Sequence, residues 1–215
     1  MRNRYSSSRP WVRLVTALLV VVAIAAQCQQ LSSAGIFHPV NVFSFFTIQS
    51  NVLAALTLLG LEFGVITAPR RLAEAARPAV VLYMSMTGIV YAVLLAPAAA
   101  DVGLTAKWVD AVVHVIAPLV VAADWFLAPP ERRPETADIP RWLIFPVLWL
   151  VYSLLRGALV NWYPYPFLDP RPEVPNAAGS AIAVTLNCIG IAVCVVAFAV
   201  ALVALTRRVT RDVRP

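Results

Sequence analysis

Charged residues are scarce in this chain. Asp, Glu, Lys and Arg make up 13% of its 215 residues, whereas a soluble domain carries about 25%. Hydrophobic residues account for 60% of the sequence. This composition is not that of a soluble domain, and it predicts an integral membrane protein made of one helical bundle.

Cysteine and histidine are also rare, with three and two copies. The cysteines (Cys28, Cys188 and Cys194) fall inside apolar segments without the spacing of a metal site, so we expect free, buried thiols. The sequence contains no internal repeat, no nucleotide-binding loop, no HExxH and no CxxC motif. We therefore predict neither a cofactor nor a metal site.

Six apolar segments are present, and each is long enough to cross about 30 Å of hydrocarbon as a helix. They are expected at 11–31, 42–66, 78–97, 107–127, 141–160 and 177–205. The first follows several arginines, as in a signal peptide, but Gln27 stands where a lipoprotein cleavage site has a small residue before its cysteine. We expect this helix to be retained. The predicted fold class is all-α, a polytopic bundle of six transmembrane helices.

Lys and Arg are distributed unevenly between the two sides of such a bundle. Fourteen fall on one side and two, Lys107 and Arg171, on the other, while Arg156 lies within a helix. The fourteen are Arg2, Arg4, Arg9, Arg13, Arg70, Arg71, Arg77, Arg132, Arg133, Arg141, Arg207, Arg208, Arg211 and Arg214. Basic residues collect on the cytoplasmic side of a cell membrane, so both termini should be cytoplasmic (N-in/C-in) in the plasma membrane. The net charge of +6 is thus topology information, and nucleic acid is not an expected partner.

This topology divides the chain into a cytoplasmic N-terminal arm (1–10), a six-helix transmembrane bundle (11–206) and a cytoplasmic basic tail (207–215). The loop 161–176, on the side opposite the termini, contains five prolines and several aromatic residues. Two interpretations stay open for it: an aromatic belt at the headgroup level, or a lid over a cavity that opens towards the outer leaflet.

The segment 43–51 carries a polar stripe in an otherwise apolar helix. At about 100° per residue, Ser44, Thr47 and Asn51 share one helix face, with Ser50 beside them. Polar groups need partners in lipid, so this stripe should face the protein interior.

Two other helices bring polar side chains to the same depth. Helical rise places Thr47 about 9 Å, His114 about 10 Å and Arg156 about 8 Å below the outer boundary. Asp110 lies one turn from His114 on the same face. Each residue alone has an ordinary structural explanation: a threonine bonded to its own helix, a packing histidine, a snorkelling arginine or an interfacial aspartate. Together they form a layer that is costly in lipid and marks a candidate site.

The chemistry of this layer suits a nucleophile and a base. A threonine hydroxyl becomes nucleophilic when an imidazole takes its proton, and a carboxylate can orient that imidazole. A guanidinium can hold a substrate carboxylate. We take Thr47 and His114 as candidate catalytic residues, and Asp110, Arg156, Asn51 and Ser50 as a supporting polar layer.

Three motifs carry a family resemblance: Phe-Thr-Ile-Gln-Ser-Asn ending at Asn51, His-Val-Ile-Ala-Pro ending at Pro118, and Tyr-Pro-Phe-Leu-Asp ending at Asp169. With them, the chain from about residue 11 to 205 resembles a bacterial family of proline-rich six-helix membrane proteins. That family is similar to the eukaryotic androgen-induced and androgen-dependent membrane proteins, which are intramembrane threonine hydrolases of fatty acid esters of hydroxy fatty acids. The resemblance implies that Thr47 is the nucleophile and His114 the catalytic histidine.

We therefore expect an intramembrane hydrolase of lipid or fatty-acyl esters, whose bilayer-buried substrate reaches the site sideways through the membrane. The alternative is a non-enzymatic scaffold, regulator or small-solute carrier whose polar layer binds a partner or an ion. The sequence shows no paired halves, which counts against a carrier. It predicts no oligomeric state.

Overall fold

The computed structural model describes residues 10–63, 70–96, 105–130 and 132–211, and the secondary structure in these ranges is entirely helical. Six helical spans are long and apolar enough to cross a membrane. This confirms the predicted all-α architecture and the number of spans.

The first three spans are simple in outline. The first is α1 (Pro10–Ser33), and the second consists of α2 (Pro39–Ser44) and α3 (Phe46–Phe63). The third is α4 (Arg70–Val90), which continues into the π-helical turn η1 (Tyr91–Leu95).

The fourth span combines α6 (Lys107–Ala111), the π-helical turn η2 (Val112–Ile116) and α7 (Ala117–Leu127). The fifth begins with the 3-10 turn η3 (Thr136–Asp138) and continues as α8 (Ile139–Val160). The sixth is α9 (Ala181–Arg211), preceded in the 161–180 loop by the 3-10 turn η4 (Pro166–Leu168).

Several helix boundaries differ from those predicted. The second span is not continuous, because Phe45 separates α2 from α3. Helix α4 begins at Arg70 and contains Pro78, whereas the predicted segment began at residue 78. The first turns of α4 are charged, so a search for apolar runs does not find them. Helix α9 continues through Arg211, into the predicted tail. The predicted arm 1–10, apart from its last residue, and the predicted ends at residues 66 and 97 lie outside the described residues.

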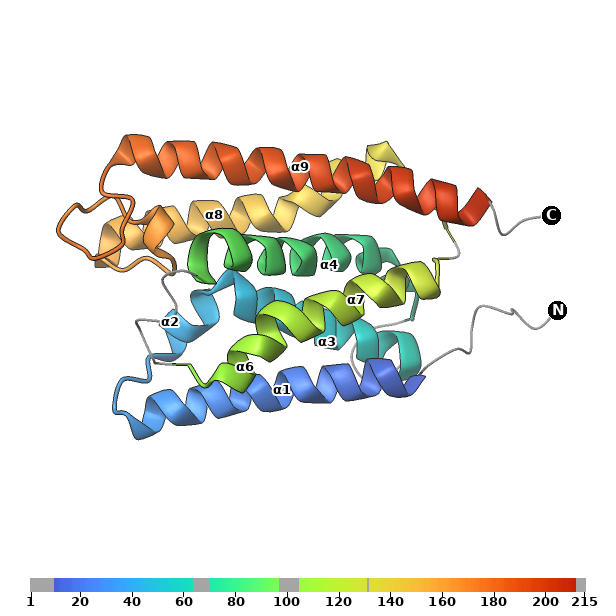
Figure 1. Ribbon diagram of the computed structural model, residues 1–215, viewed down its shortest axis with the longest axis horizontal. Coiled ribbons are helices and arrows are strands. Elements are labelled where there is room, and N and C mark those ends of the chain that lie inside the picture. Colours follow the sequence, from blue (N-terminus) through green and yellow to red (C-terminus); the bar gives the residue numbers. More distant parts are fainter. Residues whose placement is uncertain (1–9, 64–69, 97–104, 131, 212–215) are drawn as a thin grey trace.

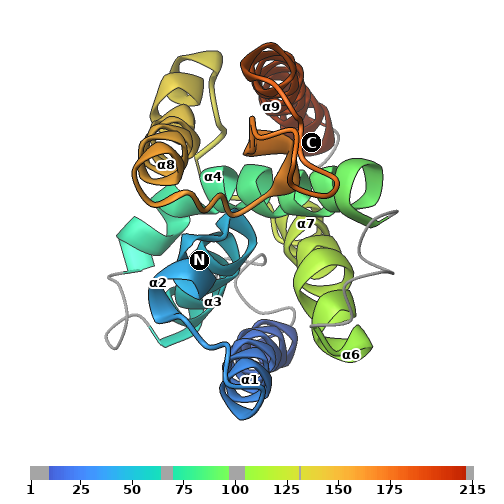
Figure 2. The same ribbon diagram turned by 90° about the vertical axis from the view of Figure 1, so that its left-hand side faces the viewer.

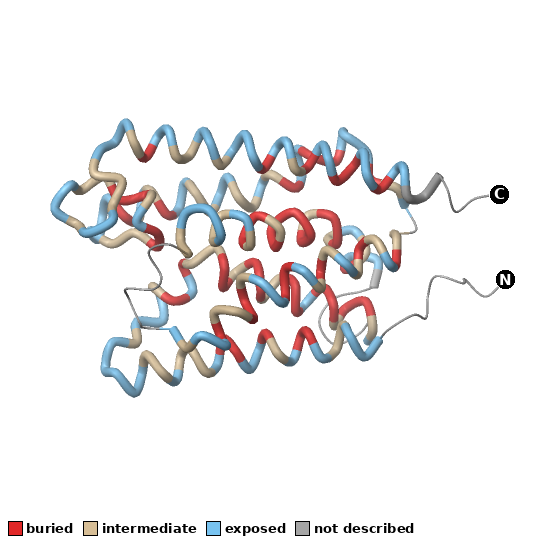
Figure 3. The backbone as a smooth tube through the Cα atoms, viewed as in Figure 1, coloured by how far each residue is buried: buried red, intermediate tan, exposed pale blue. Residues whose placement is uncertain are grey.

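Helix α4 occupies the centre of the bundle. It contacts α3 and α7 on one side and α8 and α9 on the other, and the end-on view shows it between these two groups (Figure 2). Buried residues accordingly concentrate along α3 and α4, whereas α8 and α9 are largely exposed (Figure 3). The exposed surface of α8 and α9 is apolar, as expected for helices that face lipid.

The two ends of the bundle are distinct. The start of α1 and the end of α9 lie at one end, which we call the terminal end, and the 161–180 loop lies at the other, the loop end (Figure 1). This arrangement follows from an even number of spans that alternate in direction.

A buried ionic network ties four helices together at the terminal end. Asp124 of α7 accepts hydrogen bonds from Arg13 of α1 at 2.7 Å and from Arg77 of α4 at 3.0 Å. Arg13 also pairs with Glu62 of α3 at 2.8 Å. Arg77 is only 5% exposed and lies over the ring of Trp125. Arg13 lies in α1, as predicted, whereas Arg77 lies in α4 and not ahead of the third span, whose predicted start was residue 78. Both arginines hold the bundle together.

Replacing Asp124 should destabilise the protein strongly. The Asp124→Ala variant leaves the buried Arg77 and the partly buried Arg13 without their shared carboxylate, and breaking a buried ion pair from one side costs about 3–5 kcal/mol of unfolding free energy. We expect a clearly lower Tm of the detergent-purified protein. Arg208→Ala, which removes an exposed charge from the same end, is the control. Equal Tm values for the two variants would show that the network contributes little.

Candidate functional site

Thr47 and His114 come together as their common depth predicts. Oγ1 of Thr47 on α3 lies 3.2 Å from Nε2 of His114 in η2. Nδ1 of the same imidazole lies 2.9 Å from Oδ1 of Asp110, one turn earlier. Thr47 is 7% exposed, and the side chains of His114 and Asp110 are 14% and 26% exposed. The three residues thus form a continuous hydrogen-bonded chain from a hydroxyl through an imidazole to a carboxylate.

The hydrogen-bond partners fix the direction of this chain. Tyr91 donates its hydroxyl proton to Oδ2 of Asp110, and an ionised carboxylate can only accept. Nδ1 of His114 must therefore be the donor to Asp110, which leaves Nε2 of a neutral imidazole as an acceptor. Thr47 then donates its proton to Nε2. The hydroxyl is already oriented towards the group that would remove its proton.

Two π-helical turns bring Tyr91 and His114 face to face. Their rings stack with centroids 4.1 Å apart and an angle of 10° between the planes. Each residue lies in a π turn, η1 or η2, a local widening that is frequent at functional sites. Gly88 allows the close approach of α4 to this span, because a Cβ at that position would lie 3.1 Å from the carbonyl oxygen of His114.

The interruption at Phe45 places Thr47 at the start of a helix. Phe45 has extended backbone angles (φ −68°, ψ 130°), and the break leaves backbone groups of α2 and α3 without helical partners. Three of these groups find other partners. The carbonyl of Phe43 accepts from the Gln49 amide, the carbonyl of Ser44 accepts from the Trp149 indole, and the Thr47 N–H donates to the Tyr165 hydroxyl. The break is therefore compensated by side chains from three segments.

Asn51 links the helix of Thr47 to the helix of His114. Its side-chain amide donates to the carbonyl oxygens of Thr47 at 2.9 Å and Val113 at 3.0 Å. In a π-helical turn the Val113 carbonyl would accept from the N–H of the residue five positions later. That residue is Pro118, which has no N–H, so the carbonyl needs another donor. Asn51 is completely buried and sets the position of Thr47 relative to η2.

Ser50 and Ser44, also members of the polar stripe, form hydrogen bonds to neighbouring helices. Ser50 donates to the Thr47 carbonyl and shares a 2.9 Å hydrogen bond with Thr87 of α4. Ser44 lies 2.8 Å from the hydroxyl of Tyr152 on α8. The stripe thus faces the protein interior, as predicted, and only Thr47 among these residues contacts His114 directly.

Arg156 shares the depth of the site but lies apart from it. It donates to Oδ1 of Asn41 at 2.6 Å and stacks over the ring of Trp162. Among the described residues we find no hydrogen bond from Arg156 to Thr47, His114 or Asp110, so its predicted place beside them is not confirmed. Its Nη1 is buried without a hydrogen-bond partner in the described part of the chain.

Tyr165 is a site residue that the sequence prediction missed. Its hydroxyl lies 3.0 Å from Oγ1 of Thr47 and accepts the Thr47 N–H at 3.1 Å. Tyr165 belongs to the 161–180 loop, where no helical periodicity relates a residue to a face or a depth. Its place in the Tyr-Pro-Phe-Leu-Asp motif was the only available signal. Through Tyr165 the loop lies against Thr47, and the two interpretations of this loop, an aromatic belt and a lid, stay open.

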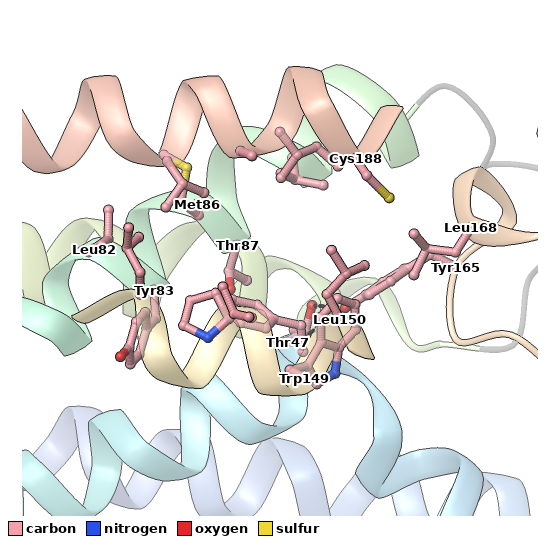
Figure 4. Close-up of a pocket in the computed structure, with 18 of the residues that line it drawn as sticks. Thr47, Leu82, Tyr83, Met86, Thr87, Trp149, Leu150, Tyr165, Leu168 and Cys188 are labelled. Carbon is pink, nitrogen blue, oxygen red and sulfur yellow. Dashed lines mark hydrogen bonds between the residues drawn. The ribbon is translucent and has the colours of Figure 1, made fainter. Parts of the chain in front are cut away.

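Thr47 lines an apolar cavity of about 180 Å³. The cavity lies between α4, α8 and α9, with Tyr165 and Leu168 at one end, a floor formed by Leu82 and Tyr83 at the other, and Thr47 between them (Figure 4). The two floor residues are 0% and 5% exposed. Two other lining groups, Val147 of α8 and Val196 of α9, are 55% and 44% exposed at the bundle surface. The cavity therefore reaches the apolar exterior between α8 and α9.

No protein-family model, curated protein or solved structure matches this chain. Within the described ranges, no three His, Cys, Asp or Glu side chains are grouped closely enough to share a metal ion. Function is therefore inferred from the chemistry of the site.

Replacing Asn51 should weaken the connection between α3 and η2. Asn51→Asp keeps the shape of the side chain but replaces the donor with an acceptor that faces two carbonyl oxygens. Leaving buried groups unsatisfied costs roughly 1–3 kcal/mol each, and we expect a lower Tm in detergent. The matched control is Gln29→Glu, the same chemical change at an exposed position of α1, which should lower the Tm less. A larger loss for Gln29→Glu would contradict this role of Asn51.

Proposed function

We propose that this protein is an intramembrane hydrolase of lipid or fatty-acyl esters with Thr47 as its nucleophile. The observation that carries the proposal is the Thr47–His114–Asp110 chain, whose first member, Thr47, also lines an apolar cavity. A hydroxyl, an imidazole and a carboxylate in this order are the groups of a nucleophilic acyl-transfer site. The resemblance to the androgen-induced and androgen-dependent threonine hydrolases supports the same assignment of Thr47 and His114.

In the first half-reaction, Oγ1 of Thr47 attacks the acyl carbonyl carbon while its proton passes to Nε2 of His114. Asp110 stabilises the imidazolium through Nδ1 and holds the ring in place. The bond from the carbonyl carbon to the alcohol oxygen then breaks, and His114 returns its proton to the departing alkoxide. The products of this half-reaction are a free alcohol and an acyl group on Thr47.

In the second half-reaction, a water molecule attacks the acyl-threonine while His114 takes one of its protons. The bond between the acyl carbon and Oγ1 breaks, and Thr47 recovers its hydroxyl proton from His114. A fatty acid is released. The site thus needs one water molecule per turnover and no other reactant.

The cavity suits the acyl chain of the substrate. It is lined almost entirely by apolar side chains, with Thr47 in its wall and a buried floor formed by Leu82 and Tyr83. An acyl chain that enters from the bilayer leaves an equally apolar environment, so the cavity would bind it by close packing rather than by removal from water. Because the cavity reaches the surface between α8 and α9, a bilayer-dissolved ester can approach sideways.

The distribution of basic residues supports a proposed orientation. With both termini in the cytoplasm, the terminal end faces inward, and the loop end with the Thr47 site faces the outer leaflet of the plasma membrane. This would place Thr47 near the depth of lipid acyl carbonyl groups.

Reporter fusions test this orientation. Fusions after Arg133 and Arg208 should report a cytoplasmic position, and an insertion near Arg171 should report an external one, because basic residues resist translocation. A cytoplasmic signal near Arg171 would invert the proposed orientation and place the site in the inner leaflet.

Substitutions of Thr47 and His114 test the hydrolase itself. Thr47→Val keeps the side-chain shape without a nucleophile, and His114→Ala removes the base. Each should lower hydrolysis of a panel of long-chain esters by about 1,000-fold or more, and the double variant should lose little further, because the residues act as one unit. Thr47→Ser should retain some turnover.

A matched control is Thr57→Val, which changes another buried threonine of α3 outside the site. It should hydrolyse the ester panel like the unmodified protein. Unchanged hydrolysis by Thr47→Val would disprove the hydrolase proposal. A collapse of Tm in both Thr47→Val and His114→Ala would instead favour the scaffold alternative, in which the polar layer stabilises the bundle.

A further inference from the structure

The 161–180 loop inserts one phenol directly beside Thr47. The Tyr165 side chain is 7% exposed, and its hydroxyl oxygen lies within hydrogen-bond distance of both the backbone N–H and Oγ1 of Thr47. Nothing in the two half-reactions above uses this group.

The protons at this point can be assigned from the available partners. The Thr47 N–H donates to the phenol oxygen, so the phenol proton must be directed elsewhere. Oγ1 of Thr47, 3.0 Å away, has a free lone pair because its own proton points to His114. At rest, Tyr165 therefore donates to the oxygen that will become the nucleophile.

This assignment changes when Thr47 attacks an ester. Oγ1 becomes a bridging oxygen bonded to carbon, and negative charge develops on the former carbonyl oxygen, which is attached to that same carbon. We propose that the Tyr165 hydroxyl then donates to this oxyanion, so that Tyr165 is a further catalytic residue of the acyl-transfer site. This inference rests on the hydrolase function proposed above. No bond to Tyr165 forms or breaks, and its proton remains on the phenol.

The surroundings of the phenol favour this role. Its oxygen accepts an N–H from the first turn of α3, an 18-residue helix, whose N-terminus carries partial positive charge. A donor whose oxygen is itself hydrogen-bonded in this way is polarised and donates more strongly. Burial raises the pKa of Tyr165 above its ordinary value, so the phenol keeps its proton at neutral pH. A preorganised donor at the developing charge is the arrangement that stabilises such intermediates.

The hydroxyl is not needed to hold the ring in place. The Tyr165 ring stacks on Phe167 at 5.1 Å and meets Phe45 edge-on at 5.4 Å. The loop is anchored separately, since Asn187 of α9 donates to the Phe167 carbonyl and the Ala178 N–H donates to the Pro166 carbonyl. A variant that lacks only the hydroxyl should therefore keep the loop in position.

The test is the ester hydrolysis of Tyr165→Phe, measured beside the unmodified protein, Thr47→Val and Tyr163→Phe. Loss of one oxyanion donor lowers kcat by about 100- to 1,000-fold, and we expect KM to stay within a few-fold because the cavity is unchanged. Tyr163→Phe, a hydroxyl deletion in the same loop away from Thr47, should keep full activity. A kcat of Tyr165→Phe equal to that of the unmodified protein would overturn this inference and leave the hydrolase proposal intact. Hydrolysis that does not depend on Thr47 would overturn both.

A second measurement tests the role of Tyr165 if the Tyr165→Phe variant fails to fold. Incorporation of 3,5-difluorotyrosine at position 165 keeps the phenol and lowers its pKa. A phenol that must stay protonated to donate should then lose activity at a lower pH, so the alkaline limb of the kcat profile should move to lower pH. The other titratable groups at the site, His114, Asp110 and Tyr91, are the same in both proteins. An unmoved alkaline limb would overturn the assignment.

Discussion

The helix that carries Thr47 is interrupted at the half-buried Phe45, and the site depends on how that interruption is compensated. Breaking a helix leaves backbone groups without partners, and those that are buried cost roughly 1–3 kcal/mol each if they stay unpaired. Here Gln49, Trp149 and Tyr165 supply the missing partners. They come from α3, from α8 and from the 161–180 loop. The same interactions that satisfy the backbone thus bring α8 and the 161–180 loop to the start of α3, where Thr47 lies.

The Asp110 carboxylate sets the direction of the hydrogen bonds in the site. It accepts from both Tyr91 and His114, so each donor further along this chain of hydrogen bonds is directed towards Asp110. Such an order is stable in a largely buried site, because each reversed hydrogen bond would leave a group unpaired. The Thr47 hydroxyl is therefore oriented towards His114 in the absence of any ligand.

Most of the helices and part of the site could be predicted from the sequence. Helix length and apolarity identify the six spans, and the rise per residue brings Thr47 and His114 to one depth. Depth does not specify the direction in which a side chain points, however. Arg156 has the expected depth, but its side chain binds Asn41. The break at Phe45 was not predictable, because neither proline nor glycine stands there. The π turns and the position of Tyr165 depend on tertiary packing, which leaves no periodic signal.

The connection between α8 and α9 has a consequence for the timing of turnover in the proposed hydrolase. The loop that joins these helices carries Tyr165, and the cavity reaches the surface between the same two helices. An outward swing of this hairpin that widened the passage for an ester would also withdraw the phenol from Thr47. Substrate exchange and chemical competence would then alternate within one motion. In a bilayer, lateral pressure that pushed the hairpin back against α4 would become a determinant of the catalytic rate.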